Sequence, residues 1–497
     1  VILLAGSAHQ ADRSDGSHAG GRLAFLAHQS RHGEETIAFK AIRQHLAVAR
    51  FEDVERQPPM WKQGAIRQQH DAAALGNSDG GHASTNETES PLHGKSDRNR
   101  RLGSTHSLFA GHGTAGRRAS GSERRAPPPP PVSPPRLRFI DMARAVAILL
   151  MLEGHFVDVT LAAGYRIAGH PVYDAWLYLR GMAAPTFFTV TGLIFAYLLG
   201  GVRDPDFLKS QRVRRGMLRV AELMFWGYLL QVNLRMVPSW IAGGSHTWFQ
   251  AFHVLQCIAV GLSVMIAVFG VFRKAGPATL AAVFLAAGFL DFLTAVLLAN
   301  AEGPIPHAAP PWIQNAIKGP WSNFPLAPWL AFTFYGAAAG VLVRHRSGGK
   351  QGGMSPAAFL VPGVILSLFG WPFDRFIGSL LLDWTGGAPQ QRVLPDLFHG
   401  RIGEILLVLA ALTWFENRFR PDASWFQTIG RNTFPIYVGH AVLLYGGFTG
   451  WGLQNLWEKS LGPWQAAAGA IVFCGFFAAC AQFVEPLSLR WRTWRGR

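Results

Sequence analysis

The first strongly apolar segment of this chain contains a histidine followed by a carboxylate three residues later. Residues 138–160 read RFIDMARAVAILLMLEGHFVDVT, with His155 and Asp158 toward the end. Residues three apart share a face of a helix. A carboxylate in that place can orient an imidazole and raise its basicity, as general-base catalysis requires. The alternative interpretation is a polar contact between two packed helices.

The same segment begins with a second charged pair, Asp141 and Arg144. These two side chains could form an interfacial ion pair, or they could hold an anionic ligand. At 1.5 Å of rise per residue, His155 lies roughly 16 Å beyond Arg144, near the middle of a bilayer if the helix spans one. Ionisable groups are costly at that depth, so a functional role is the default interpretation for His155.

Ten apolar segments of spanning length follow from residue 136 onward. Their approximate limits are 142–162, 183–201, 215–233, 252–272, 277–299, 324–343, 355–373, 401–416, 432–449 and 463–485. The sequence therefore predicts an all-α, polytopic transmembrane helix bundle of about ten spans over residues 136–497.

Residues 1–135 have a different composition, rich in His, Gly, Ser, Arg and Gln and ending in a run of prolines. Such a segment has too little apolar surface to form a core, so we expect a disordered tail. We also expect this tail to be dispensable, or to come from an over-extended translation start.

Basic residues predict the orientation of the bundle. The chain has 46 Lys and Arg against 30 Asp and Glu, a net charge of +16. In a ten-span arrangement the basic connections fall on one side, which the positive-inside rule assigns to the cytoplasm together with both termini. We therefore expect an integral protein of the bacterial inner membrane. Because loops and tail account for the positive excess, no nucleic-acid partner is expected.

The three cysteines, Cys257, Cys474 and Cys480, all lie in predicted spans without metal-ligand spacing. We therefore predict no metal site.

Four motifs in order resemble one known family. They are RFIDMARAVAILLM from Arg138, APTFFTVTG from Ala184, FHVLQCI from Phe252 and FPLAPW from Phe324. Together they are similar to the catalytic domain of heparan-alpha-glucosaminide N-acetyltransferase, over about residues 136–485. The resemblance implies transfer of an acetyl group from cytosolic acetyl-CoA to a sugar amine or hydroxyl on the other side of the membrane.

The resemblance also implies site residues. His170 occupies the loop in which the lysosomal enzyme of this family has its essential histidine, whereas His155 stands where that enzyme has an asparagine. His155 and His170 are thus both candidates for the base, with Asp158 orienting an imidazole. The candidates for the CoA-binding site lie on the predicted cytoplasmic side: Asp141, Arg144, Arg212, Arg214 and Arg215. The alternative interpretation of Arg212, Arg214 and Arg215 is that they only set the orientation of the protein in the membrane.

Two other classes of function remain open at the level of sequence. A proton-coupled transporter or flippase could use the intramembrane histidines and carboxylates, and an inactive binding or scaffold subunit is a third interpretation. The expected partners of an acyltransferase are the lipid bilayer, acetyl-CoA and a glycan or glycolipid acceptor, with a homodimer as an open alternative.

Overall fold

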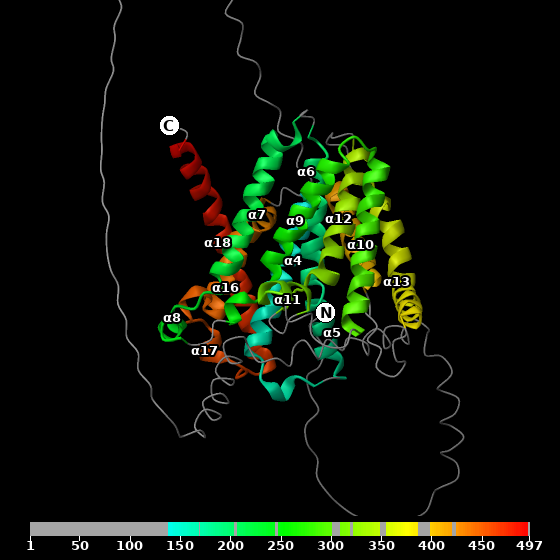
Figure 1. The fold of residues 1–497 in the computed structure, drawn as a ribbon. Coiled ribbons are helices and arrows are strands. Elements are labelled where there is room, and N and C mark those ends of the chain that lie inside the picture. The colour runs from blue at the N-terminus through cyan, green and yellow to red at the C-terminus, as the bar shows by residue number, and fades with distance from the viewer. Residues whose placement is uncertain are drawn as a thin grey trace, which may run out of the picture.

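The computed structural model describes residues 138–167, 169–202, 206–243, 247–300, 309–318, 322–347, 354–385, 398–419 and 424–495. The expectation for the tail concerns residues 1–135, which lie outside these ranges. Within them the protein is a bundle of helices without a β-strand, as the sequence predicts (Figure 1).

The long helices follow the predicted apolar segments in order. Their bounds are α4 Arg138–Thr160, α6 Ala183–Leu199, α7 Gln211–Leu229, α9 Val254–Val271, α10 Pro277–Asn300, α12 Leu326–Arg346, α13 Ala357–Trp384, α14 Phe398–Phe419, α16 Thr433–Tyr445 and α18 Pro463–Arg495. Shorter helices connect them: α5 Pro171–Arg180, α8 Val237–Ile241, α11 Pro311–Ile317, α15 Ser424–Arg431 and α17 Gln454–Trp457.

Seven helical segments in the described part of the chain are long and apolar enough to cross a membrane. They are α5 with α6, then α9, α10, α12, α13, α14 and residues Pro463–Phe483 of α18. The protein is therefore an integral membrane protein. Of the other three predicted spans, α4 and α7 contain several charged residues and α16 has only 13 residues, so the count of ten stays a prediction.

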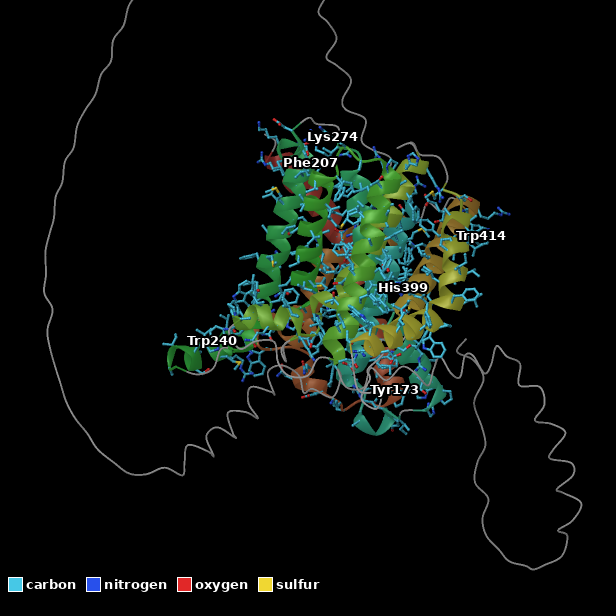
Figure 2. All side chains as sticks on the ribbon, turned by 45° about the vertical axis from the view of Figure 1, so that its right-hand side comes forward. Tyr173, Phe207, Trp240, Lys274, His399 and Trp414 are labelled. Atoms are coloured by element: carbon cyan, nitrogen blue, oxygen red, sulfur yellow. The ribbon has the colours of Figure 1, made fainter. Side chains whose placement is uncertain are left out.

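The bundle has two distinct ends. The basic end contains the start of α4 at Arg138 and the turn between α9 and α10 with Lys274, whereas the far end contains α5, α8, α11 and α17 (Figure 1). In Figure 2, Lys274 and Phe207 mark the basic end, Trp240 and Tyr173 mark the far end, and His399 lies between them. The predicted clustering of basic loops on one side corresponds to the basic end.

Glycines allow α6 and α12 to pack with their backbones nearly in contact. A Cβ atom added at Gly336 would lie 2.0 Å from the carbonyl oxygen of Thr189, and one at Gly340 would lie 2.2 Å from that of Leu193. Gly192 of α6 approaches the carbonyl of Thr333 in the same way. In a membrane, where the hydrophobic effect does not drive helices together, this close packing holds them in contact. Gly336 and Gly340 thus form a small-residue face on α12.

Helices α13 and α14 form an antiparallel hairpin in which glycines again bring the two backbones into close contact. A Cβ at Gly370 would meet the backbone of Gly400 at 2.4 Å, and one at Gly403 would meet the backbone of Ser367 at 2.4 Å. The observed α13 runs to Trp384, eleven residues beyond the predicted end at 373. Its outer face exposes large apolar residues such as Leu368 and Phe376, as expected of a helix against lipid.

Helix α4 lies in the interior with its charged residues. It packs against α6, α14, α15, α16 and α18, and its residues Ala145, Ile148 and Leu152 are fully buried. Gly430 of α15 lies against the carbonyl of Asp141, and Gly469 of α18 lies against the ring of Phe156. The neighbours of α4 therefore decide what its ionisable groups meet.

We expect Gly336→Ala to destabilise the protein, because its new methyl group has no space against the Thr189 carbonyl. Overpacking of this kind costs about 1–3 kcal/mol. Gly475→Ala in α18 is the matched control, because nothing lies within 4 Å of the added Cβ. Thermal unfolding in detergent should show a lower midpoint for Gly336→Ala only. Equal midpoints for both variants would contradict the close contact of α6 with α12.

Candidate active site

His155 faces a second histidine and a tyrosine from α16. The ring centroid of His155 lies 5.3 Å from that of His440 and 5.7 Å from that of Tyr445. Tyr437, one turn before His440, places its ring 5.1 Å from the His440 ring. We call His155, His440, Tyr437 and Tyr445 the histidine cluster. The packing of α16 on α4 brings these four residues together.

The imidazole of His155 is available for chemistry. Its Nδ1 atom is buried and has no hydrogen-bond partner among the residues that the structure describes. A buried polar atom without a partner is unusual in a folded protein and marks a place where substrate can supply the missing contact.

Asp158 is engaged by two arginines at the far end. Its carboxylate lies 2.9 Å from Nη1 of Arg166 and 3.3 Å from Nη2 of Arg180. Arg166 also donates to the carbonyl oxygen of Asp158. The predicted partnership of Asp158 with His155 therefore competes with two ion pairs, and it stays a prediction.

Arg180 brings the end of α5 next to the histidine cluster. Its aliphatic carbons cover Gly154, where an added Cβ would lie 2.7 Å from Cγ of Arg180. Trp176, one turn earlier on α5, donates from its indole nitrogen to Glu153 at 2.8 Å. Helix α5 is thus attached to α4 at the two residues immediately before His155.

His170 lies in the loop between α4 and α6, where the sequence predicts it. It is exposed at the N-cap position of α5, and its imidazole has no hydrogen-bond partner among the described residues. Its role as a base stays a prediction beside that of His155.

His253, by contrast, has a structural role at the start of α9. Its side chain and that of Gln256 form a reciprocal cap on the first turn. Burial lowers the pKa of His253 to about 4, so its imidazole is neutral at pH 7.

Two arginines converge on the start of α16 near the basic end. Nη2 of Arg144 donates to the hydroxyl of Thr433 at 2.6 Å, and Cζ of Arg219 lies 4.1 Å from the ring centroid of Phe434. The two guanidinium groups are close enough to repel each other electrostatically, while Asp141 attracts Arg144. We call Arg144, Arg219 and Thr433 the arginine cluster.

The other arginines predicted to bind CoA lie on two different faces of α7. Arg212 and Arg215 share a face with Arg219, because positions 0, 3 and 7 of a helix lie in one row. Arg212 donates to the carbonyl of Leu198 at 2.8 Å, and Arg214 and Arg215 are exposed. The binding residues predicted from the sequence include Arg214, which lies off this row, but not Arg219, although Arg219 follows Arg212 by seven residues.

A third group, the His399 cluster, joins α12, α13 and α14. Both nitrogens of His399 have partners: Nδ1 contacts Oδ1 of Asp374, and Nε2 lies 2.8 Å from the hydroxyl of Tyr335. The other oxygen of Asp374, a fully buried residue, accepts the backbone N–H of His399 at 2.8 Å. The carboxylate thereby caps the first turn of α14. Sequence analysis missed Asp374 because it placed the end of α13 one residue before it.

Asp291 on α10 plays a similar part for α12. Its carboxylate accepts the backbone N–H of Ala331 at 2.9 Å, just after the irregular backbone at Ala327. Two intramembrane carboxylates are therefore compensated by backbone groups at helix starts, which need no cationic side chain.

A comparison with protein families decides the classification. A family model described as "Heparan-alpha-glucosaminide N-acetyltransferase, catalytic" matches residues 136–370. Residues 136–370 of the chain therefore belong to this family's catalytic domain. The resemblance found in the sequence is thus confirmed, and membership in the heparan-alpha-glucosaminide N-acetyltransferase family indicates a membrane acetyltransferase. No curated protein matches the chain.

The matched residues contain one part of each cluster. His155, Arg144 and Tyr335 lie inside residues 136–370, whereas His440, Thr433, Asp374 and His399 come from the following helices. The matched segment therefore needs the part of α13 after residue 370, together with α14 and α16, to complete these clusters.

We expect Tyr335→Phe to destabilise the protein, since it leaves Nε2 of His399 without its partner. A buried polar atom that loses its hydrogen bond costs about 1–3 kcal/mol. Tyr165→Phe is the control, because Tyr165 is exposed. Thermal unfolding of the two variants measures the difference, and an unchanged midpoint for Tyr335→Phe would mean that the phenol adds nothing to the cluster.

Proposed function

We propose that this chain transfers an acetyl group from acetyl-CoA, bound at the basic end, to an amine or hydroxyl of a sugar at the far end. The observation that carries this proposal is the pairing of a cationic site with a histidine site on one helix, α4. Arg144 and His155 lie roughly 16 Å apart along it. By the positive-inside rule the basic end is cytoplasmic, so donor and acceptor meet the protein from opposite sides.

Arginines at the basic end suit the phosphates of CoA. The arginine cluster offers two buried or half-buried cations at the start of α16, a helix whose first turn itself favours anions. Arg344 and Arg212 meet nearby over Gly201, where an added Cβ would lie within 2.7 Å of both guanidinium groups. Nη1 of Arg344 is buried without a hydrogen-bond partner in the described part of the chain. Guanidinium donors of this kind fit an anionic ligand.

The histidine cluster supplies the proton transfer. As the acceptor nitrogen or oxygen attacks the thioester carbonyl, the free imidazole nitrogen of His155 takes its proton. The new carbon–nitrogen or carbon–oxygen bond forms, the carbon–sulfur bond breaks, and CoA leaves as the thiolate, which then receives a proton. His170 in the same role, or an acetyl group carried transiently by the imidazole, are variants of this scheme.

A second candidate function is a proton-coupled carrier. One observation favours it: the His399 cluster links an imidazole, a carboxylate and a phenol inside the bundle. Carboxylates also accept backbone N–H groups near the starts of two helices, α12 and α14. Activity would then depend on a proton gradient and not on acetyl-CoA, and transport into sealed vesicles without acetyl-CoA separates the two candidates.

His155→Ala should lower acetyl transfer on the order of a hundredfold, because the attacking group loses its base. His345→Ala, at an exposed position at the end of α12, is the control. Turnover with acetyl-CoA and a panel of amino sugars measures the effect. Loss of turnover in His170→Ala instead would assign the base to His170, and full activity in both variants would contradict the mechanism.

Arg219→Gln should weaken acetyl-CoA binding about tenfold, because a charge-assisted contact to phosphate is lost. Arg214→Gln should have a smaller effect, since Arg214 lies off the row of Arg212, Arg215 and Arg219. Arg273→Gln, exposed in the turn after α9, controls for the general loss of a positive charge. Thermal stabilisation by acetyl-CoA reports the binding. Equal losses in all three variants would show that only the overall positive field matters.

A further inference from the structure

Arg401 of α14 contacts the last turn of α5. Its guanidinium lies 4.0 Å from the ring centroid of Tyr178, and its Nη1 lies 3.3 Å from both the Tyr178 carbonyl and Oε2 of Glu404. The Tyr178 hydroxyl donates to the other oxygen of Glu404. Arg401 is 7% exposed, so its side of this network is buried, whereas the Glu404 side chain is partly exposed. We call Arg401, Glu404 and Tyr178 the α5 clamp.

The α5 clamp acts on the last turn of α5. The Tyr178 carbonyl belongs to the helix end, where carbonyl groups lack partners within the helix and a cation is favourable. Arg401 supplies that cation, and its Nη2 would lie 3.6 Å from a Cβ added at Gly181. The end of α5 is therefore held from the α14 side.

The opposite side of the same turn holds the candidate site. Residues two apart on a helix point in nearly opposite directions, so Tyr178 meets α14 while Arg180 meets α4. Arg180 reaches Asp158 at 3.3 Å and covers Gly154, the neighbour of His155. Any displacement of Tyr178 must move Arg180 with it.

Helix α14 is itself fixed two residues before Arg401. His399 is held by Asp374 of α13 and Tyr335 of α12, and Asp374 also caps the first turn of α14. The clamp therefore rests on a part of α14 that has polar anchors to two other helices.

We propose that Arg401 and Glu404 are positioning residues that hold Arg180 against Asp158 beside His155. This inference rests on the proposed acetyl transfer. It gives α14, which lies outside the residues matched by the family model, a defined part in the reaction. The clamp fixes where Arg180 places its positive charge, and so the surroundings in which the His155 imidazole meets its substrate.

A double-mutant cycle tests the proposal. Arg401→Gln should lower kcat by about tenfold or more through misplacement of Arg180, with the KM for acetyl-CoA unchanged. In an Arg180→Gln background the same change should have little further effect, because Arg401 acts through Arg180. Arg418→Gln, at the other end of α14 beside Phe419, is the matched control and should keep full activity.

A second measurement does not depend on activity. Hydrogen exchange of the backbone amides of residues 172–180 should rise in Arg401→Gln and in Tyr178→Phe, while exchange in α12 stays unchanged. If the wild-type chain transfers no acetyl group but α5 loosens as described, the proposed function fails and the clamp stands. Multiplicative losses of kcat in the cycle, or unchanged exchange in α5, would overturn the positioning role.

Discussion

Charged groups inside an apolar bundle must be compensated by the protein itself, because hydrocarbon offers neither water nor counterions. Helix α4 is where this constraint acts most strongly, with Asp141 and Arg144 toward one end and Glu153, His155 and Asp158 toward the other. Three of these charged groups have a partner on another helix or on the loop after α4: Thr433 for Arg144, Trp176 for Glu153, and Arg166 with Arg180 for Asp158. His155 keeps a buried ring nitrogen without a hydrogen-bond partner among the described residues, and this supports our proposal that it acts as the base.

Close backbone packing gives these contacts their geometry. The glycines of α6, α12, α13 and α14 bring helices to distances at which side chains cannot be placed between them, so the helix positions have little freedom. Two carboxylates, Asp291 and Asp374, then satisfy the starts of α12 and α14. The polar interior and the glycine contacts are therefore parts of one arrangement, in which rigid helices place a few ionisable groups.

Apolar segments long enough to span predicted the helices well, because length and hydropathy are local properties. Helix α13 extends eleven residues beyond the apolar segment predicted to end at 373, and Asp374 was therefore not among the candidate groups. The meeting of His155 with His440 could not be predicted, since it depends on how α16 packs on α4. The arginine pairs of Asp158 show the same limit: three-residue spacing places His155 and Asp158 on one face, but α5 and the preceding loop supply the competing cations.

Acetyl transfer across the membrane is the central claim, and its direction can be measured in sealed inside-out vesicles that contain the full chain. Acetyl-CoA labelled in the acetyl group is added outside, at the cytoplasmic face, with an amino sugar trapped inside. The account predicts labelled acetyl sugar in the vesicle interior and release of unlabelled free CoA outside, where acetyl-CoA was added. Product that forms only when the sugar is outside with acetyl-CoA, or no product at all while acetyl-CoA binds, would contradict it.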